Sequence, residues 1–243
     1  MRGVLATRDR RAFVEQVMGM PVSLHVRGAV ETAEVEAAAG QVFGTLRRAD
    51  AVFSTWRDDS DLLRVRRGDL GPGEAHPWLA EVRDLCAAAQ RQTGGLFSAT
   101  FADVHDPTGL VKGWAVERAA GHLGHVPGIS FCLNAGGDVW AGAGLGAQPS
   151  VWRVGIEDPA DRSRVAATVE LSRGGMATSG NAARGAHIAD PRTGLPVHRT
   201  GSATVWGPSL VWADVWATAL FVDPARGREA LEGADPAYRC LVL

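Results

Sequence analysis

The segment from residue 209 to 221, Ser-Leu-Val-Trp-Ala-Asp-Val-Trp-Ala-Thr-Ala-Leu-Phe, constrains the fold most. It is apolar enough to form a helix buried in the core, so other elements must cover it. Asp214 and Thr218 stand four residues apart within it, which stacks a carboxylate and a hydroxyl on one helical face. Hard oxygen ligands on one face are what a magnesium–phosphate site requires. A core helix with two satisfied polar groups is an equally open interpretation of this segment.

A second feature is the use of lysine. Lysine and arginine together number 25, and Lys112 is the only lysine. Arginine presents a planar fork and lysine a compact ammonium group, so the two are not equivalent where space is tight or a phosphate is a point contact. Lys112 stands at a glycine-rich turn that opens an amphipathic segment, Gly109-Leu-Val-Lys-Gly-Trp-Ala. We therefore expect Lys112 to belong to a functional site.

The bulk composition limits the class of protein. A chain of 243 residues has room for one domain or two small ones, and we expect a single domain over 1–243. The net charge of −2 gives no electrostatic footprint for nucleic acid or an anionic membrane. No apolar run reaches the length of a membrane span, and the first residues lack the apolar stretch of a signal peptide. Cys86, Cys132 and Cys240 have no CxxC spacing and are expected to be reduced, mostly buried thiols, which predicts a cytoplasmic protein.

Helical and strand patterns mix along the chain without regular alternation, which favours an α+β fold over a doubly wound sheet. Strands are predicted where apolar residues alternate with polar ones, and helices where they recur at helical spacing. The predicted strands are 21–27, 131–134, 139–141, 151–157, 164–171, 202–206 and 238–243. The predicted helices are 31–49, 60–65, 77–92, 112–123, 209–221 and 226–232.

Six landmarks occur in order along the chain. They are Met18-Gly-Met20, the segment 53–63, Gly95-Leu-Phe-Ser98, the segment 106–113, Leu133-Asn-Ala-Gly-Gly-Asp138 with the later 152–159, and the stretch 178–220. Each is weak alone, but together they cover roughly residues 16–222. In this order they make the chain resemble the FAD:protein FMN transferase (ApbE) family, as a compact branch. The resemblance implies a single α+β domain of mixed or antiparallel sheets flanked by helices, ApbE-like and related to the T-fold.

The resemblance also implies a set of site residues. Mg²⁺ would be bound by the side chains of Asp214 and Thr218 and by the backbone carbonyl of Gly109. His187 and Asp214 are the candidate general bases, and we favour His187 because a carboxylate that binds the metal is a poor base. The residues expected to bind FAD are Met18, Trp56, Leu96, Phe97, Ser98, Asp106, Lys112, His187 and Ile188.

The sequence departs from the family pattern in two places. Ser98 follows Phe97 where the family usually has Asp, and Asp106-Pro-Thr-Gly109 replaces Asp-Leu-Gly-Gly. The segment between Phe97 and Asp106 is also very short. These departures affect flavin recognition more than the metal site.

Three functions fit this set of residues. In the leading one, a threonine or serine hydroxyl of an acceptor flavoprotein attacks the FAD pyrophosphate, FMN becomes ester-linked and AMP leaves. Mg²⁺ would offset the negative charge of the phosphates, and Lys112 would add a second positive charge. In the second, water replaces the acceptor and the chain is an FAD pyrophosphatase. In the third, motivated by Ser98 and the short 98–105 segment, the chain carries FAD without chemistry.

Other residues have simpler interpretations. Trp56 is either a core residue or a ring that stacks on FAD, and the sequence does not decide between them. Asp190-Pro-Arg-Thr-Gly194 has the chemistry of a type I turn, which we expect to orient His187. Gly136 and Gly137 indicate a tight hairpin turn that leaves Asp138 as a candidate polar contact. His25 is expected on the exposed face of its strand.

Overall fold

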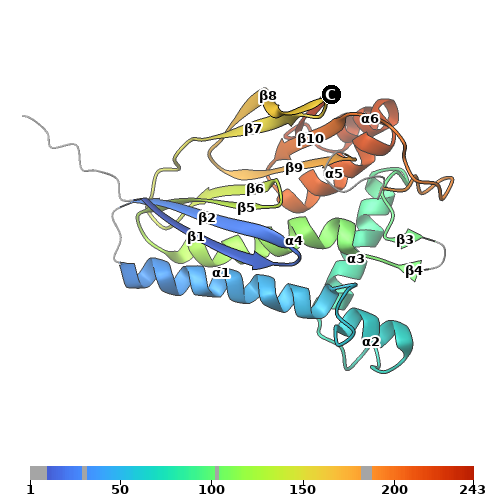
Figure 1. Ribbon diagram of the computed structural model, residues 1–243, viewed down its shortest axis with the longest axis horizontal. Helices are drawn as coiled ribbons and strands as arrows, with labels where there is room; N and C mark the ends of the chain where they lie inside the picture. The colour runs from blue at the N-terminus through green and yellow to red at the C-terminus, as the bar shows by residue number, and fades with distance from the viewer. Residues whose placement is uncertain (1–9, 29–31, 102–103, 182–187) are drawn as a thin grey trace, which may run out of the picture.

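The computed structural model describes residues 10–28, 32–101, 104–181 and 188–243 (Figure 1). Within them lies a seven-stranded sheet in the order β1-β2-β5-β6-β9-β10-β11, with every neighbouring pair antiparallel. The expected α+β fold is thus confirmed, with an antiparallel main sheet. The strands of this sheet are β1 (Arg10–Val17), β2 (Met20–Gly28), β5 (Ile129–Ala135), β6 (Asp138–Ala143), β9 (Gly174–Gly180), β10 (Ser202–Gly207) and β11 (Arg239–Val242).

Two small hairpins stand outside the main sheet. One pairs β3 (Thr100–Phe101) with β4 (Val104–His105), and the other pairs β7 (Trp152–Asp158) with β8 (Asp161–Leu171). The helices of the described residues are α1 (Thr32–Phe53), α2 (Asp61–Arg67), α3 (Trp78–Gln92), α4 (Thr108–Ala120), the 3₁₀ helix η1 (Gly121–His125), α5 (Leu210–Val222) and α6 (Pro224–Ala234).

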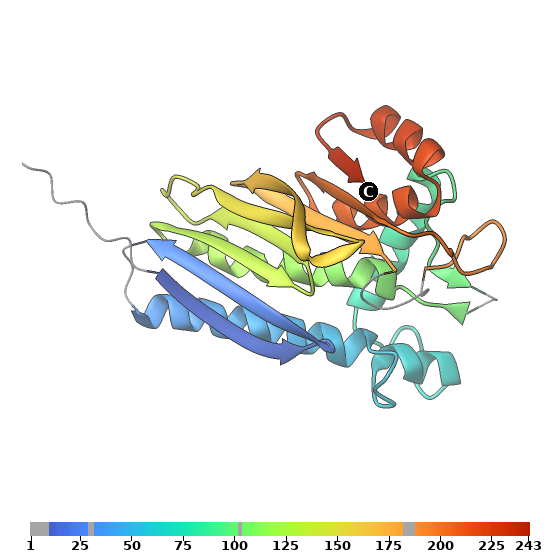
Figure 2. The same cartoon turned by 45° about the horizontal axis from the view of Figure 1, so that its top comes forward.

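The main sheet has two buried faces of different character. Side chains alternate between them, so Leu24 and Leu133 join the large core under the helices, whereas Cys132 and Met176 face the opposite way. We call the first side the helix face and the second the hairpin face. The β7–β8 hairpin crosses the hairpin face and closes a smaller core with Trp152 and Leu171 (Figure 2). The hairpin face of β1 and β2 stays open, and His25 is exposed there as expected.

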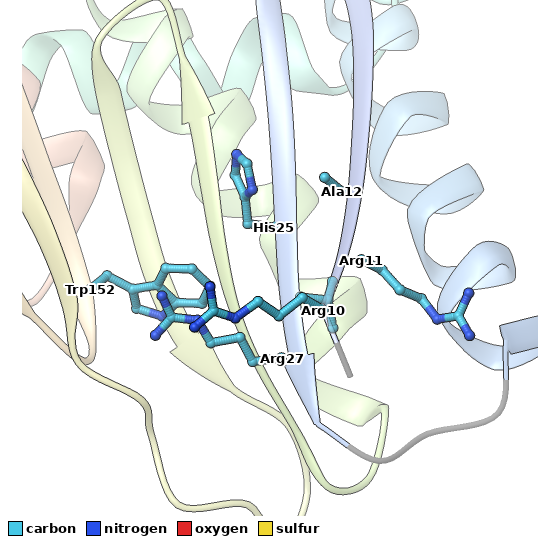
Figure 3. Close-up of a pocket in the computed structure, with 7 residues that line it drawn as sticks. Arg10, Arg11, Ala12, His25, Arg27 and Trp152 are labelled. Atoms are coloured by element: carbon cyan, nitrogen blue, oxygen red, sulfur yellow. The ribbon is translucent and has the colours of Figure 1, made fainter. Parts of the chain in front are cut away.

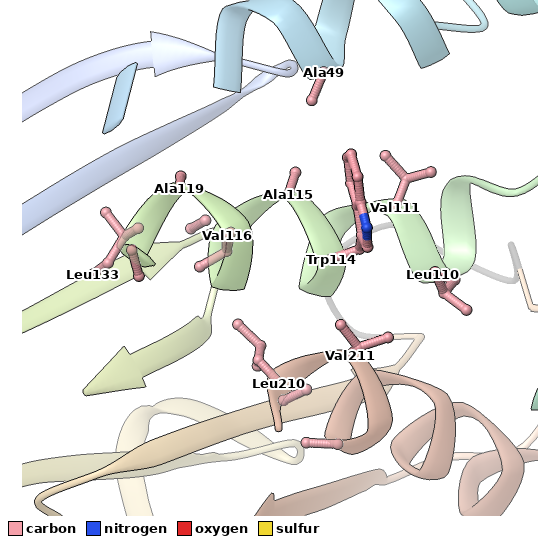
Figure 4. Packing of buried hydrophobic residues seen from close by; sticks show 14 of the residues in the cluster. Ala49, Leu110, Val111, Trp114, Ala115, Val116, Ala119, Leu133, Leu210 and Val211 are labelled. Carbon is pink, nitrogen blue, oxygen red and sulfur yellow. The ribbon is translucent and has the colours of Figure 1, made fainter. Parts of the chain in front are cut away.

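Helix α4 is the centre of the helical layer. Figure 4 shows it between α1 and α5, with Ala115 and Ala119 on the side toward Ala49 of α1. Leu210 approaches from the N-terminal end of α5. Small side chains let the helix axes come close, which leaves few gaps in the core. Helices α4 and α5 therefore hold each other's position tightly, and this matters for the site below.

Most predicted elements are confirmed, and four strands were missed: the two-residue strands β3 and β4, and β1 and β9 of the main sheet. β1 has an exposed or half-buried residue at every position except Val17, so its apolar alternation is faint, as is common at a sheet edge. β9 reads Gly-Gly-Met-Ala-Thr-Ser-Gly, and glycine has a low strand propensity. A Cβ at Gly175 would lie 2.5 Å from the Cα of Leu210, so α5 needs this glycine. Helix α4 also begins at Thr108 rather than at the predicted residue 112.

The cysteines match the expectation of mostly buried, unpaired thiols. Cys86 and Cys132 are buried and Cys240 is half-buried, and none is in a disulfide. Burial raises the pKa of both Cys86 and Cys132 to about 12, which makes them poor nucleophiles. Their part is to fill the two cores.

Candidate active site

Several chain turns meet at one end of the main sheet. The β1–β2 turn at Met18 and Gly19 and the β5–β6 turn at Gly136 and Gly137 lie side by side, because Val22 pairs with Ala135. A Cβ at Gly136 would lie 2.9 Å from the sulfur of Met20. Both glycines of the β5–β6 turn have positive φ, so the predicted tight turn is confirmed. Asp138 begins β6 directly after this turn.

Lys112 and two carboxylates form a buried charge cluster at this end. The Lys112 Nζ lies 2.8 Å from Asp138 Oδ2 and 3.9 Å from Asp214 Oδ1. The side chains of Asp138 and Asp214 are 1% and 5% exposed, and that of Lys112 is 17% exposed. Buried charges are stable only when paired, so each member depends on the others. The structure thus brings the only lysine of the chain close to Asp214, and the functional role of both stays a prediction.

Gly113 fixes the second oxygen of Asp214. Its backbone amide donates a hydrogen bond to Asp214 Oδ2 over 3.1 Å. A Cβ at Gly113 would lie 2.8 Å from the carbonyl oxygen of Leu210 and 3.1 Å from the Cβ of Asp214. Only glycine allows α4 and α5 to approach this closely. In a regular α-helix the Gly113 amide would donate a hydrogen bond to the carbonyl of Gly109, four residues earlier. That carbonyl is the expected metal ligand.

The other expected metal ligands provide hard oxygens. Thr218 stands one turn after Asp214 on α5, and its Oγ1 lies 3.1 Å from Ser179 Oγ of β9. Gly109 is exposed in the first turn of α4. A Cβ added to Gly109 would lie 3.5 Å from the Phe97 ring. Among the described residues, no three His, Cys, Asp or Glu side chains gather as a metal site. Oxygen ligands from a carboxylate, a hydroxyl and a carbonyl are of the type that Mg²⁺ prefers, so the assignment of these three residues to a metal stays a prediction.

Three of the residues expected to bind FAD have side chains in the core. Leu96, Phe97 and Ile188 are 1%, 3% and 9% exposed. The Thr93 hydroxyl holds this segment by accepting a hydrogen bond from the Phe97 amide at 3.0 Å. These residues can therefore offer a ligand their backbone more readily than their side chains.

Ser98 and Asp106 are held by local hydrogen bonds. The Ser98 hydroxyl accepts from the Thr100 amide at 3.0 Å, and Asp106 Oδ1 accepts from the Thr108 amide at 3.0 Å. The Asp106 amide donates to the carbonyl of Ala99 at 2.6 Å, which brings the two ends of the short segment together. Asp106 is exposed and stands two residues before the start of α4 and six residues before Lys112.

Met18 and Trp56 lie in turns. Met18 has a positive φ of 55° in the β1–β2 turn, and its side chain packs partly against the large core. Trp56 follows α1 and is 94% exposed, so the core interpretation of this residue is wrong. An indole so exposed is available to stack on a planar ligand.

His187 lies outside the described residues, so its place in the site stays a prediction. The turn that follows it is confirmed, because the Asp190 carbonyl accepts hydrogen bonds from the Thr193 amide at 3.2 Å and the Gly194 amide at 2.8 Å. Arg192 braces this turn with bonds to Asp190 and Asp223, at 2.7 and 2.9 Å. The hydrogen bond from Arg192 holds the pKa of Asp190 below its usual value.

A separate hollow of about 160 Å³ opens on the hairpin face of β1 and β2, at the far end of β2 from the Met18 turn (Figure 3). The Arg27 guanidinium lies 3.8 Å above the Trp152 ring and donates to the Val151 carbonyl. Arg10 reaches the same place, whereas Arg11 points to the other side of the sheet (Figure 3). The hollow shares no residue with the Lys112 cluster.

Across the described parts of the chain, no helix is both long and apolar enough to cross a membrane.

The importance of Asp138 in the candidate site was not predicted from sequence patterns. The sequence marked it only as a polar side chain after a hairpin turn, yet it makes the shortest contact with Lys112. The pairing depends on how α4 lies against β6, which no local pattern encodes. The available signal was a carboxylate in a segment that is otherwise apolar and small, Ala-Gly-Gly-Asp-Val-Trp.

The antiparallel sheet and its helical layer have the fold of solved structures named as flavin transferases. The structure of the Pseudomonas stutzeri flavinyl transferase ApbE, in its apo form, superposes with a TM-score of 0.78 at 22% identity, over 99% of this chain and 96% of that one. The FAD:protein FMN transferase of Klebsiella pneumoniae is 26% identical over 79% of this chain and 73% of its own length. That of Salmonella typhimurium is 37% identical, over 46% of this chain and 34% of its own length.

The family model of the ApbE family matches residues 18–107 and 105–242. The chain therefore belongs to the ApbE family. The resemblance predicted from the six landmarks is confirmed.

Proposed function

We propose that this chain is a single-domain, Mg²⁺-dependent FAD:protein FMN transferase that modifies a threonine or serine hydroxyl of an acceptor flavoprotein. The relatives named FAD:protein FMN transferase support the reaction. The structural observation that supports this reaction in the present chain is the buried cluster of Lys112, Asp138 and Asp214, with Thr218 one helical turn after Asp214. Carboxylates held in fixed positions favour the binding of a cation, and phosphate groups would bind through that cation.

The proposed step exchanges one phosphoester for another. The acceptor oxygen attacks the phosphorus on the FMN side of the FAD pyrophosphate, and a new P–O bond forms. The bond from that phosphorus to the bridging oxygen breaks, and AMP leaves with the bridging oxygen. The hydroxyl proton passes to a base, for which His187 and Asp214 remain the candidates.

Residues of this chain would perform three tasks in that step. Asp214 and Thr218, with the carbonyl of Gly109, would hold the metal, which when bound offsets phosphate charge and orients the reacting group. Asp138 would hold the Lys112 ammonium in place, so that it meets the pyrophosphate as a point charge. The exposed Trp56, with Ser98 and Asp106, would contact the rest of FAD.

AMP release tests this proposal. Full-length protein is incubated with FAD and Mg²⁺, with and without a peptide that carries an acceptor threonine, and AMP and flavin-labelled peptide are measured. We expect peptide-dependent AMP from the wild type and a loss of at least 10³-fold in Asp214→Ala, because transition-state charge is then uncompensated. Asp161→Ala is the control, since Asp161 lies on the β7–β8 hairpin and bonds only Ser163 among the contacts seen for it.

Each other outcome identifies one of the alternatives. AMP and free FMN without peptide would indicate an FAD pyrophosphatase. FAD that stays bound without any AMP release would indicate a carrier. Unchanged activity in Asp214→Ala would refute the proposed metal site.

A further inference from the structure

Glu117 of α4 binds the first turn of α5 from outside that helix. Its Oε2 accepts hydrogen bonds from Ser209 Oγ at 2.8 Å, from the Leu210 amide at 2.7 Å and from the Val211 amide at 3.0 Å. The first amides of a helix lack partners within it and form its positive end, so a carboxylate there is favourable. Ser209 is already the N-cap of α5 in the chain itself. Glu117 is a second cap, from 92 to 94 residues away.

The sideways position of α5 is fixed by close contacts at three glycines. Added Cβ atoms would lie 2.8 Å from the Leu210 carbonyl oxygen at Gly113, 2.5 Å from Leu210 Cα at Gly175, and 2.9 Å from Leu220 Cα at Gly227. These contacts come from α4, β9 and α6. They prevent α5 from moving toward any of these neighbours.

The carboxylate of Glu117 restrains α5 along its axis, in addition to the contacts that Asp214 makes with the Gly113 amide and Lys112. Glu117 stands five residues after Lys112 on α4, and Leu210 stands four residues before Asp214 on α5. At about 1.5 Å per residue, the cap lies within about 8 Å of the charge cluster along each helix. A slip of α5 by even part of a turn would separate Asp214 from the Gly113 amide and from Lys112.

We propose that Glu117 is a positioning residue that sets the axial register of α5, and thereby places Asp214 and Thr218 for metal binding. The role rests on the proposed function, because it presumes that these two residues bind Mg²⁺. Substitution of Glu117 should therefore weaken Mg²⁺ binding by more than a general loss of stability would.

Glu81 of α3 offers a matched control, because its carboxylate binds residues of α4. Its Oε1 accepts from Trp114 Nε1 at 2.9 Å and from Arg118 Nη1 at 2.8 Å, so it also anchors α4. The contacts seen for Glu81 do not include α5. Glu81→Ala should therefore weaken the packing of α4 without changing the register of α5.

The experiment compares Glu117→Ala, Glu117→Gln and Glu81→Ala in the full chain. Mg²⁺ is titrated calorimetrically into each protein with FAD present, and the half-saturating Mg²⁺ and the maximal rate of AMP release are measured separately. We expect Glu117→Ala to raise the half-saturating Mg²⁺ about tenfold in both readouts. Glu117→Gln keeps an oxygen that accepts from the same amides and should stay within about threefold of wild type. Glu81→Ala should stay within twofold, even if its melting temperature falls.

Equal Mg²⁺ affinity in Glu117→Ala and Glu81→Ala would overturn the positioning role while leaving the proposed function intact. A wild type that binds no Mg²⁺ would instead refute the metal site, and this role with it. The two failures are therefore distinguishable in one set of titrations.

Discussion

Two parts of the candidate site are built in opposite ways. The first, which we call the α4–α5 contact, comprises Lys112, Gly113, Asp138, Asp214 and Thr218. Its charges are buried, and its backbones touch at Gly113. Each group is held by a contact from another element of the fold.

The second part, which we call the exposed rim, comprises Trp56, Ser98, Asp106 and the turn 190–194. Its polar side chains bond mainly to residues two positions away, as in the Ser98–Thr100 and Asp106–Thr108 contacts. Trp56 is almost fully exposed. Such segments adapt to a ligand at little cost to the fold.

The difference follows from what each part must do. A buried charge cluster creates a fixed field in a region with little water, which is where stabilising phosphate charge is most effective. Contacts with a large planar ligand tolerate small shifts, so they can lie on turns. We therefore expect substitutions in the α4–α5 contact to change stability and activity together, and those in the exposed rim to change ligand affinity alone.

The largest effect is expected from Lys112→Met, which would leave Asp138 and Asp214 without their ammonium partner. Breaking a buried ion pair costs about 3–5 kcal/mol of unfolding free energy, and we expect about 3 because Lys112 is partly exposed. Urea unfolding measures it. The double variant Lys112→Met/Asp138→Asn should recover part of the loss, since the unpaired charge of Asp138 is then removed.

The exposed pair of Arg47 with Glu15 is the control for that prediction. Its N–O distance is 2.6 Å, and Arg47 is 55% exposed. Arg47→Met should cost less than about 1 kcal/mol, because water screens a surface pair. Equal losses in the two single variants would remove the contrast between buried and exposed charges.

Gly113→Ala tests the backbone side of the α4–α5 contact. The new methyl group would press on the Leu210 carbonyl at 2.8 Å, and overpacking of this kind costs about 1–3 kcal/mol. Activity should fall with stability because Asp214 is displaced. Gly121→Ala is the matched control, since a Cβ there meets nothing within 4 Å and its φ is −55°. A Gly113→Ala protein as stable and active as Gly121→Ala would show that the helices have room to spare.

The sequence predicted the elements that have strong periodicity. The strand 21–27, the helices 77–92 and 209–221 and the hairpin around Gly136 were all predictable, because burial on one face or on all faces leaves a regular pattern. β9 was not, because its glycines are present for close contacts with distant residues, as Gly175 is for the approach of Leu210, more than 30 residues later. These tertiary contacts explain its composition.

The site shows the same division. Asp214, Thr218 and Lys112 could be selected from their unusual surroundings, and the structure brings Lys112 within 3.9 Å of Asp214. Asp138 and Glu117 could not be assigned partners from sequence. Their contacts depend on how α4 lies against β6 and α5, which is set by packing over the whole core. The metal and flavin roles themselves came from the family resemblance.

Trp56→Ala tests the exposed rim. Because the side chain is 94% exposed, the unfolding free energy should change by no more than about 0.5 kcal/mol. If the indole stacks on FAD, the loss of about 0.5–1.5 kcal/mol raises the KM for FAD by roughly 2- to 10-fold, with little change in kcat. Val165→Ala on β8, which is 63% exposed, is the control. A fall in kcat with unchanged KM would place Trp56 with the buried part of the site.

The smallest effect is expected at Asp190, in the turn after His187. The bond from Arg192 lowers its pKa, so its contribution to stability is present above the unfolded pKa of about 3.9 and is lost as pH falls through the folded value. Asp223, which shares Arg192, also has a lowered pKa, because bonds from the Arg226 amide and Arg192 outweigh burial. Asp190→Asn keeps the oxygen that accepts from the Arg192 amide and removes the charge.

We expect Asp190→Asn to lower the unfolding free energy by about 0.5 kcal/mol at pH 7, the size of a screened surface pair. The difference from wild type should shrink as the pH falls through the lowered pKa of Asp190, because both proteins then carry a neutral group at this position. Urea unfolding from pH 7 to pH 3 measures it, with the exposed Asp84→Asn as the control. A loss at pH 7 well above 1 kcal/mol would mean that the 190–194 turn is held as firmly as the α4–α5 contact. The turn would then belong to the rigid part of the site, which would limit how far it can adapt to FAD.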